Sequence, residues 1–110
     1  NRAWSGQRCR AHALPEFYGA THDAYVAALK SRGLTPAEIG QHAGVADTSL
    51  TLAIDASLVR GDALAKAGKP VAGDGIDGDP RKSTRALGEI GVARIVDASV
   101  AALQRALGQH

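Results

Sequence analysis

The apolar stretch from Leu50 to Val59 is the feature that most constrains the fold of this chain. Its large apolar side chains belong to Leu50, Leu52, Ile54, Leu58 and Val59, with Ala53 among them. Apolar residues around so much of the circumference predict a helix that other elements cover. The rest of the chain offers few segments that could cover it. We therefore expect the chain to be part of a larger α/β unit.

Length and composition restrict the chain to a single domain or part of one, here a single partial domain over residues 1–110. Its 110 residues can bury one core. Hydrophobic residues make up 45% of the chain and aromatic residues only 4%, so the core must consist of close-packed Ala, Val, Leu and Ile. The first ten residues are polar and irregular, as in a tail or a severed loop.

Charge and hydropathy argue against two classes of partner. The formal charge of +2 comes from interspersed acidic and basic residues, which gives nucleic-acid binding little support. No stretch approaches the roughly twenty apolar residues that cross a bilayer, and no signal-peptide core is present at the start. The single cysteine, Cys9, agrees with a reducing compartment, so we expect a cytoplasmic protein.

Local patterns predict the elements of the N-terminal half. Residues 9–17 favour a short strand, which Pro15 would end or confine to an edge. Thr21 is expected to cap a helix that ends at Gly33. A second, shorter helix is expected between Thr35 and Gly40, because Thr-Pro-Ala-Glu places a capping residue, a proline and a reciprocal glutamate in order.

The C-terminal half is predicted to be a loop followed by a long helix. Residues 68–80 are rich in Gly, Asp and Pro, and they match neither a calcium loop nor a phosphate-binding loop. Asp79 and Pro80 are expected to cap a helix that runs to Gly108. Its apolar residues recur at helical spacing, which predicts a core-facing stripe of Leu87, Ile90, Val96, Val100, Leu103 and Leu107.

The run from His42 to Ser49 concentrates the chemistry of the chain. An imidazole stands five residues before Asp47, on a flexible Ala-Gly approach to the apolar helix. One interpretation is capping, since Asp47, Thr48 and Ser49 lie where the first helical N–H groups need partners. The other is a hydrolytic or metal-assisted site, in which Asp47 is a metal ligand and His42 a ligand or general base.

Two separated groups of motifs resemble those of the creatininase (creatinine amidohydrolase) family, in the same order. The first group is His42-Ala43-Gly44, Asp47-Thr48-Ser49-Leu50 and Leu52-Ala53-Ile54, and the second is Gly78-Asp79-Pro80 with Ser83-Thr84. The resemblance runs from about Tyr18 to the end of the chain.

The resemblance implies an α/β fold, namely the C-terminal part of a three-layer α/β/α domain that is helix-rich within this chain. It implies a metal-dependent amidohydrolase that cleaves a C–N bond in a small cyclic or acyl-amide substrate, and a homo-oligomer, often a hexamer. His42 would be the catalytic histidine that contacts substrate or moves a proton, and Gln41 would line the pocket. Asp47 would bind metal where many members have a glutamate, which is one methylene longer.

The family's other metal-ligand motifs are missing. Neither the early Glu-x-His with its following Asp nor the Gly-His-Gly-Gly-Asn-like loop occurs, and His12, His22 and His110 lack a matching context. The chain therefore resembles a C-terminal half, and zinc, manganese or iron would be bound mostly by residues outside it. There the metals would lower the pKa of a bridging water.

Three interpretations of this half remain open. The first, which we favour, is a half enzyme that an N-terminal half or partner chain completes. The second is a piece of a longer polypeptide. The third is an inactive structural or interaction domain. The sequence identifies neither the substrate nor the metal.

Overall fold

A computed structural model describes residues 2–6 and 8–108 of the chain. The described residues form α1 (Glu16–Gly19), the π-helical segment η2 (Ala20–Tyr25), α2 (Val26–Lys30), α3 (Pro36–Ile39), α4 (Val45–Ile54), α5 (Gly61–Lys66) and α6 (Arg85–Gly108), with single 3₁₀ turns η1 (Arg2–Trp4), η3 (Ala56–Leu58) and η4 (Pro80–Lys82). No strand occurs in these residues, and the only bridge between extended segments pairs His42 with Asp77. The helix-rich expectation is confirmed for this chain, whereas the three-layer α/β/α arrangement is not visible in it.

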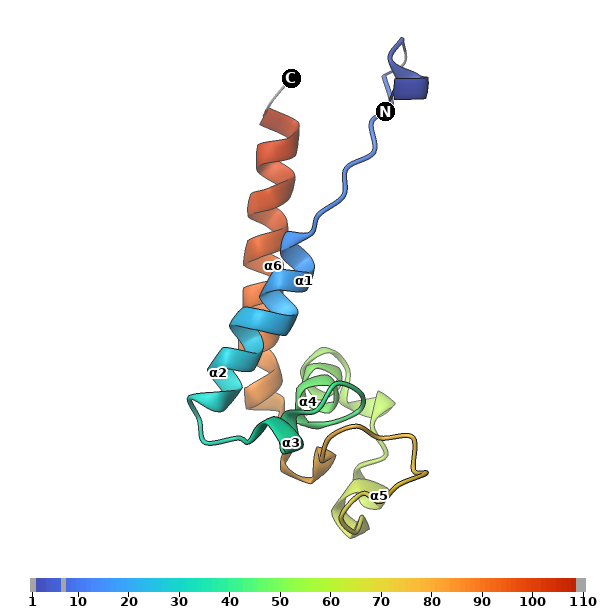
Figure 1. The fold of residues 1–110 in the computed structure, drawn as a ribbon, viewed down its shortest axis with the longest axis vertical. Helices are drawn as coiled ribbons and strands as arrows, with labels where there is room; N and C mark the ends of the chain where they lie inside the picture. The colour runs from blue at the N-terminus through green and yellow to red at the C-terminus, as the bar shows by residue number, and fades with distance from the viewer. Residues whose placement is uncertain (1, 7, 109–110) are drawn as a thin grey trace.

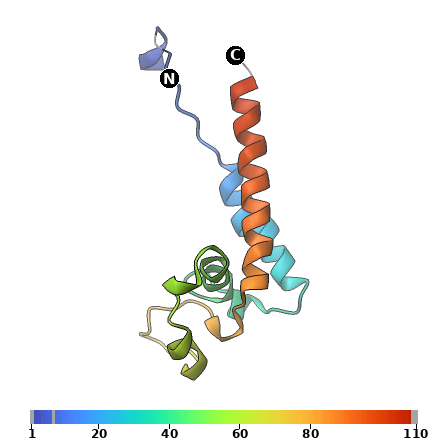
Figure 2. The same cartoon turned by 180° about the vertical axis from the view of Figure 1, so that it is seen from behind.

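The long helix α6 is the axis of the molecule, which measures 57 × 28 × 24 Å (Figure 1). The helix built from α1, η2 and α2 lies along α6, and α4 packs across its N-terminal end. Seen from behind, α3, α5 and the connecting loops gather at that same end (Figure 2). The short helices and loops are therefore concentrated at the N-terminal end of α6.

The first long helix begins earlier than predicted. Pro15 has a φ of −63° and a ψ of −20°, and the chain stays helical from Glu16 through the π segment to Lys30. Proline fits the start of a helix, and a lone strand would have no strand to pair with among the described residues. The predicted strand over residues 9–17 is therefore wrong. Thr21 lies inside the helix, where its hydroxyl donates to the Phe17 carbonyl at 2.9 Å, so it is not a cap.

Two helix boundaries are confirmed. Gly33 adopts a φ of +85° and donates to the Lys30 carbonyl, while the Leu34 N–H reaches the Leu29 carbonyl. This pair of bonds is a Schellman motif, which favours glycine at the left-handed position. The capping box that was predicted to begin α3 is also present, with Thr35 as its N-cap and Glu38 as the reciprocal partner.

Helices α4 and α6 cross at glycines. A methyl group on Gly88 would overlap the backbone carbonyl of Ser49, and one on Gly91 would meet Leu50 and the Tyr25 ring within 3 Å. The fully buried Tyr25 packs there, and its hydroxyl donates to the Ala46 carbonyl at 3.4 Å. The adjoining core cluster consists of Tyr25, Leu29 and Ile39, with Val26, Leu34, Ala46, Leu50 and Leu87 packed against it.

The apolar helix is shorter and less covered than predicted. α4 ends at Ile54, whose side chain is 73% exposed, and Leu58 in η3 is 69% exposed. The stripe of α6 is also only partly core, because α1 and η2 pack on another face of α6, where Ala102 is buried and Arg105 pairs with Glu16. Leu87 and Ile90 are half-buried, whereas the outer half of the stripe is exposed at Val96, Val100, Leu103 and Leu107.

The start of α6 also differs from the prediction. Asp79 and Pro80 begin the single turn η4, where the Asp79 carboxylate accepts the Arg81 N–H at 3.1 Å. The hydroxyl of Thr84 accepts the Leu87 N–H at 3.1 Å and so caps α6 itself. No helix among the described residues has both the length and the apolar character needed to cross a membrane.

Candidate functional site

The loop that carries His42 is fixed by the backbone of Asp77. The N–H groups of Gln41 and His42 both donate to the Asp77 carbonyl, at 2.9 and 3.0 Å, and the Asp77 N–H donates to the His42 carbonyl at 2.9 Å. These bonds bind the His42 loop to the Gly-Asp-Pro loop that leads toward α6. The backbone position of His42 therefore depends on a segment far away in the sequence.

Glycine is required where these two loops cross. A methyl group on Gly40 would overlap the Asp77 carbonyl, and one on Gly44 would overlap the Ile39 carbonyl. Gly78 has a φ of +140°, and its added methyl would lie 2.6 Å from the Gly44 Cα. The backbones therefore pack at a distance that only residues without a Cβ allow.

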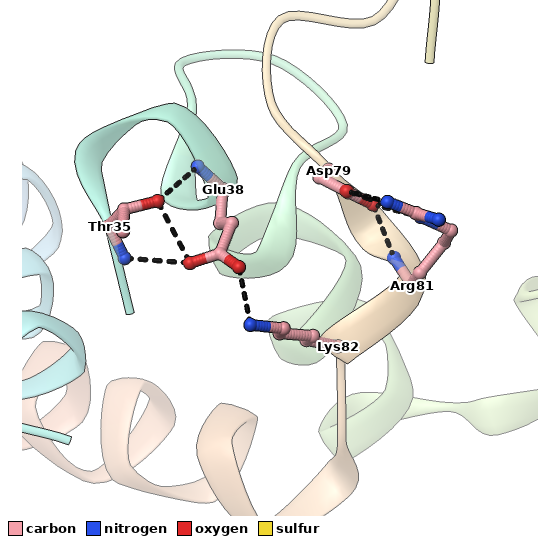
Figure 3. A network of polar contacts seen from close by, with 5 residues as sticks. All are labelled: Thr35, Glu38, Asp79, Arg81 and Lys82. Atoms are coloured by element: carbon pink, nitrogen blue, oxygen red, sulfur yellow. Dashed lines mark hydrogen bonds and ion pairs between the residues drawn. The ribbon is translucent and has the colours of Figure 1, made fainter. Parts of the chain in front are cut away.

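Residues next in sequence to the crossing form a polar network of two groups, Thr35–Glu38–Lys82 and Asp79–Arg81 (Figure 3). Glu38 accepts the Thr35 N–H and hydroxyl, each at 2.8 Å, and its other oxygen pairs with the Lys82 ammonium at 2.5 Å. The Lys82 ammonium, followed by the Thr35 backbone N–H, lowers the pKa of Glu38 to about 2. The Arg81 guanidinium binds both oxygens of Asp79 and lowers the pKa of that carboxyl to about 2.

Acid should weaken the fold through this network. A carboxyl whose pKa is lower in the folded chain than in the unfolded chain stabilises the fold at any pH above its unfolded pKa. This stabilisation is lost as the pH falls through the folded pKa. For Glu38 the window runs from the ordinary value of 4.5 down to about 2. We expect the melting temperature to fall across this window, and Glu38→Gln to flatten the fall in thermal melts at stepped pH.

Glu89→Gln is the matched control for that prediction. Glu89 forms an exposed pair with Arg85 on α6, with 60% of its side chain exposed. The Glu89→Gln variant should have an acid profile close to that of the wild type, because exposed ion pairs contribute little to stability. If Glu38→Gln has the same acid profile as the wild type, the network does not stabilise the crossing.

His42 and Asp47 line the same cleft, as a hydrolytic or metal-assisted site would require. The cleft has a volume of about 570 Å³ and lies between α4, α5 and the two crossing loops. Both side chains are exposed, and in the described part of the chain the His42 imidazole has no hydrogen-bond partner. The remaining wall is mainly apolar and includes Leu58, Val59, Leu64 and Ile76, with Arg60 at its edge.

Asp47 does not cap the first turn of α4 in the way the sequence suggested. The helix begins at Val45, so Asp47 and Thr48 lie within its first turns, and the N-cap is Gly44 without a side-chain cap. Asp47 Oδ2 instead accepts the N–H of Ala43, before the helix, at 3.0 Å. Ser49 is fully buried, and its hydroxyl accepts the Thr84 N–H at 3.2 Å.

Gln41 does not line the cleft that His42 lines. It lines a second pocket of about 420 Å³, together with His22, Lys30 and Asp77. Asp47 lines both pockets, whereas Gln41 and His42 each line only one of them.

The described residues contain no group of three or more His, Cys, Asp or Glu side chains that could hold a metal ion. His12 and His22 are exposed, and His22 stacks on Tyr18 with ring centroids 6.3 Å apart. His110 lies outside the described residues. The donors of this part of the chain therefore do not fit a complete metal centre, and they offer Asp47 and His42 as isolated groups.

Sequence reasoning missed the residues that hold and complete the cleft. The Asp77 backbone pairs with His42, and α5 contributes Leu64 to the wall. The three glycines at positions 40, 44 and 78 were the available signal, because glycines at a loop crossing indicate close approach of two backbones. Nothing in the apolar pattern indicated that α5 would be a separate short helix.

Comparison with known proteins assigns the class. A model of the creatininase family, described as creatinine amidohydrolase, matches residues 5–103. The match covers most of the chain and includes His42, Asp47 and the crossing loops, so the chain belongs to the creatininase family. No curated protein and no solved structure matches it.

Proposed function

We propose that the chain forms one wall of the active site of a metal-dependent amidohydrolase of the creatininase type. The observation that carries the proposal is that His42 and Asp47, both within the matched family region, line one cleft. The substrate would be a small molecule with an amide or cyclic amide bond. A cleft of about 570 Å³ with mainly apolar walls and few polar groups is suited to such a ligand.

His42 is the residue we assign to proton transfer. His42 is exposed and lines the cleft, and histidine is the side chain that most often acts in general acid–base catalysis. Hydrolysis adds water across the C–N bond, and His42 would deliver a proton to the departing nitrogen. Gln41 would contact a substrate only from the second pocket, which Asp47 also lines.

The metal would be held mainly by residues outside this chain. Asp47 is the ligand we propose from this chain, through Oδ1, because Oδ2 is occupied by the Ala43 N–H. Zinc, manganese or iron suit carboxylate and imidazole donors. The remaining ligands, and the strands of a three-layer α/β/α domain, would come from an N-terminal half or a partner chain. Homo-oligomers, including hexamers, and a cytoplasmic location remain part of the proposal.

Reconstitution tests the function. The 110-residue chain is assayed for hydrolysis of creatinine and of small linear amides with Mn²⁺ or Zn²⁺. The assay is run alone and after co-expression with a creatininase-type N-terminal half that carries the Glu-x-His motif. We expect no turnover from the chain alone and turnover from the assembled protein. A metal-loaded assembly that hydrolyses none of these amides would contradict the proposal.

The alternative is an inactive structural or interaction domain. The exposed apolar side chains on the outer half of α6, at Val96, Val100, Leu103 and Leu107, favour it because they suit contact with another protein surface. Under this alternative the assembly forms but His42 has no effect on any hydrolysis.

A further inference from the structure

Ala43 has a backbone conformation that its side chain disfavours. Its φ of +55° is the only positive value among non-glycine residues in the described ranges. In this region the Cβ crowds the carbonyl oxygen, so L-residues other than Asn and Asp rarely adopt it. Such a conformation persists only where the surroundings hold it.

Two side chains from α4 hold Ala43. Asp47 Oδ2 accepts its N–H at 3.0 Å, and the Thr48 hydroxyl donates to its carbonyl at 3.3 Å. Both polar groups of the Ala43 backbone are thus bound by neighbouring residues of one helix. The Asp47 bond is charge-assisted, which makes it the stronger of the two.

The residue before Ala43 is His42, which is anchored on its other side. Its N–H and carbonyl both bond to the Asp77 backbone, at 3.0 and 2.9 Å. The imidazole makes no hydrogen bond or ion pair with the described residues. The direction of the His42 Cα–Cβ bond is therefore set by the backbone on either side, and one of the two anchors is the carboxylate of Asp47.

We propose that Asp47 is a positioning residue for His42: its carboxylate locks Ala43 in the left-handed conformation that directs the imidazole into the cleft. This role matters for catalysis only if the proposed function holds. It is separate from the proposed metal binding through Asp47 Oδ1. It also differs from helix capping, because the N–H that Asp47 binds lies two residues before Val45, where α4 begins.

Amide exchange and side-chain NMR on the 110-residue chain test the proposal. Asp47→Ala removes the acceptor, whereas Asp47→Asn keeps an oxygen that can accept the Ala43 N–H but lacks the charge. We expect Asp47→Ala to speed exchange at the Ala43 amide about tenfold or more, since hydrogen bonds to charged groups are worth that factor. We also expect His42 to populate one χ1 rotamer in the wild type and in Asp47→Asn, and to average between rotamers in Asp47→Ala.

The matched control is Asp62→Ala. Asp62 is also an exposed aspartate in the first turn of a helix, α5, and it should change neither readout. The proposal is overturned if His42 keeps one rotamer in Asp47→Ala, or if Asp47→Asn averages it equally. The proposal is also overturned if Asp47→Ala speeds exchange at the α4 amides as much as at the Ala43 amide, because Asp47 would then only stabilise the helix.

These readouts need no turnover, so the two proposals fail separately. An assembled protein with an ordered His42 that hydrolyses no amide would overturn the proposed function and leave the positioning role standing. An averaged His42 rotamer in the wild type would overturn the positioning role alone.

Discussion

Replacing Gly88 by alanine is expected to destabilise the chain by about 3 kcal/mol, the upper range for overpacking a close contact. The added methyl group would overlap the Ser49 carbonyl and lie 2.8 Å from the Ala53 Cβ, so α4 would have to move away from α6. Domains of this size have a total stability of about 5–15 kcal/mol. The free energy of unfolding in urea measures the loss.

Gly108→Ala is the control for Gly88→Ala, because both glycines lie in α6 and both changes add one methyl group. Nothing lies within 4 Å of a methyl group at Gly108. We expect this variant to stay within about 0.5 kcal/mol of the wild type, as for most surface substitutions. Equal stability of the two variants would show that α4 and α6 do not cross at Gly88.

Replacing His42 by alanine is expected to lower kcat of the assembled enzyme by about 10²- to 10⁴-fold, the usual contribution of a general acid or base. The free energy of unfolding should change by less than about 0.5 kcal/mol, because the exposed imidazole packs in no core. Initial rates on creatinine and thermal melts of the same samples separate the two effects.

His22→Ala is the control histidine. It is exposed like His42, but it stacks on Tyr18 and lines the second pocket. The kcat of His22→Ala should stay within a few-fold of the wild-type value, because His22 does not line the His42 cleft. If His42→Ala turns over at the wild-type rate, or if His22→Ala loses as much, then His42 is not the proton carrier.

Local sequence patterns predicted boundaries that depend on local chemistry. The Thr35–Glu38 capping box and the Gly33 terminus are confirmed because their bonds join residues within five positions of each other. Thr21 and Asp79 were assigned caps by equally good patterns, but Thr21 lies inside its helix and Asp79 caps the turn η4 instead of α6. Pro15 starts the first helix earlier, and Asp79 binds Arg81 while Thr84 caps α6.

The site was predicted only in part for a similar reason. The run from His42 to Asp47 contains both residues to which we assign chemistry in the cleft, so the sequence could indicate them. The Asp77 backbone that anchors His42 lies far along the chain, and no local pattern reports such a contact. The left-handed Ala43 also has no sequence signal, because alanine disfavours that conformation.

Burial was the least predictable property. The patterns of α4 and α6 indicated apolar faces correctly, yet Ile54 and Val96 are exposed because no described element packs over them. Periodicity identifies which face of a helix is apolar, and only the tertiary arrangement decides whether that face is covered.

Native mass spectrometry with metal analysis, on protein isolated from its natural source, tests the central claim most directly. The claim is that this chain supplies His42 and Asp47 to a metal-dependent amidohydrolase whose other ligands come from elsewhere. We expect the chain, or a longer polypeptide that contains it, in an assembly that carries zinc, manganese or iron. A lone 11.3 kDa species without bound metal would contradict the account.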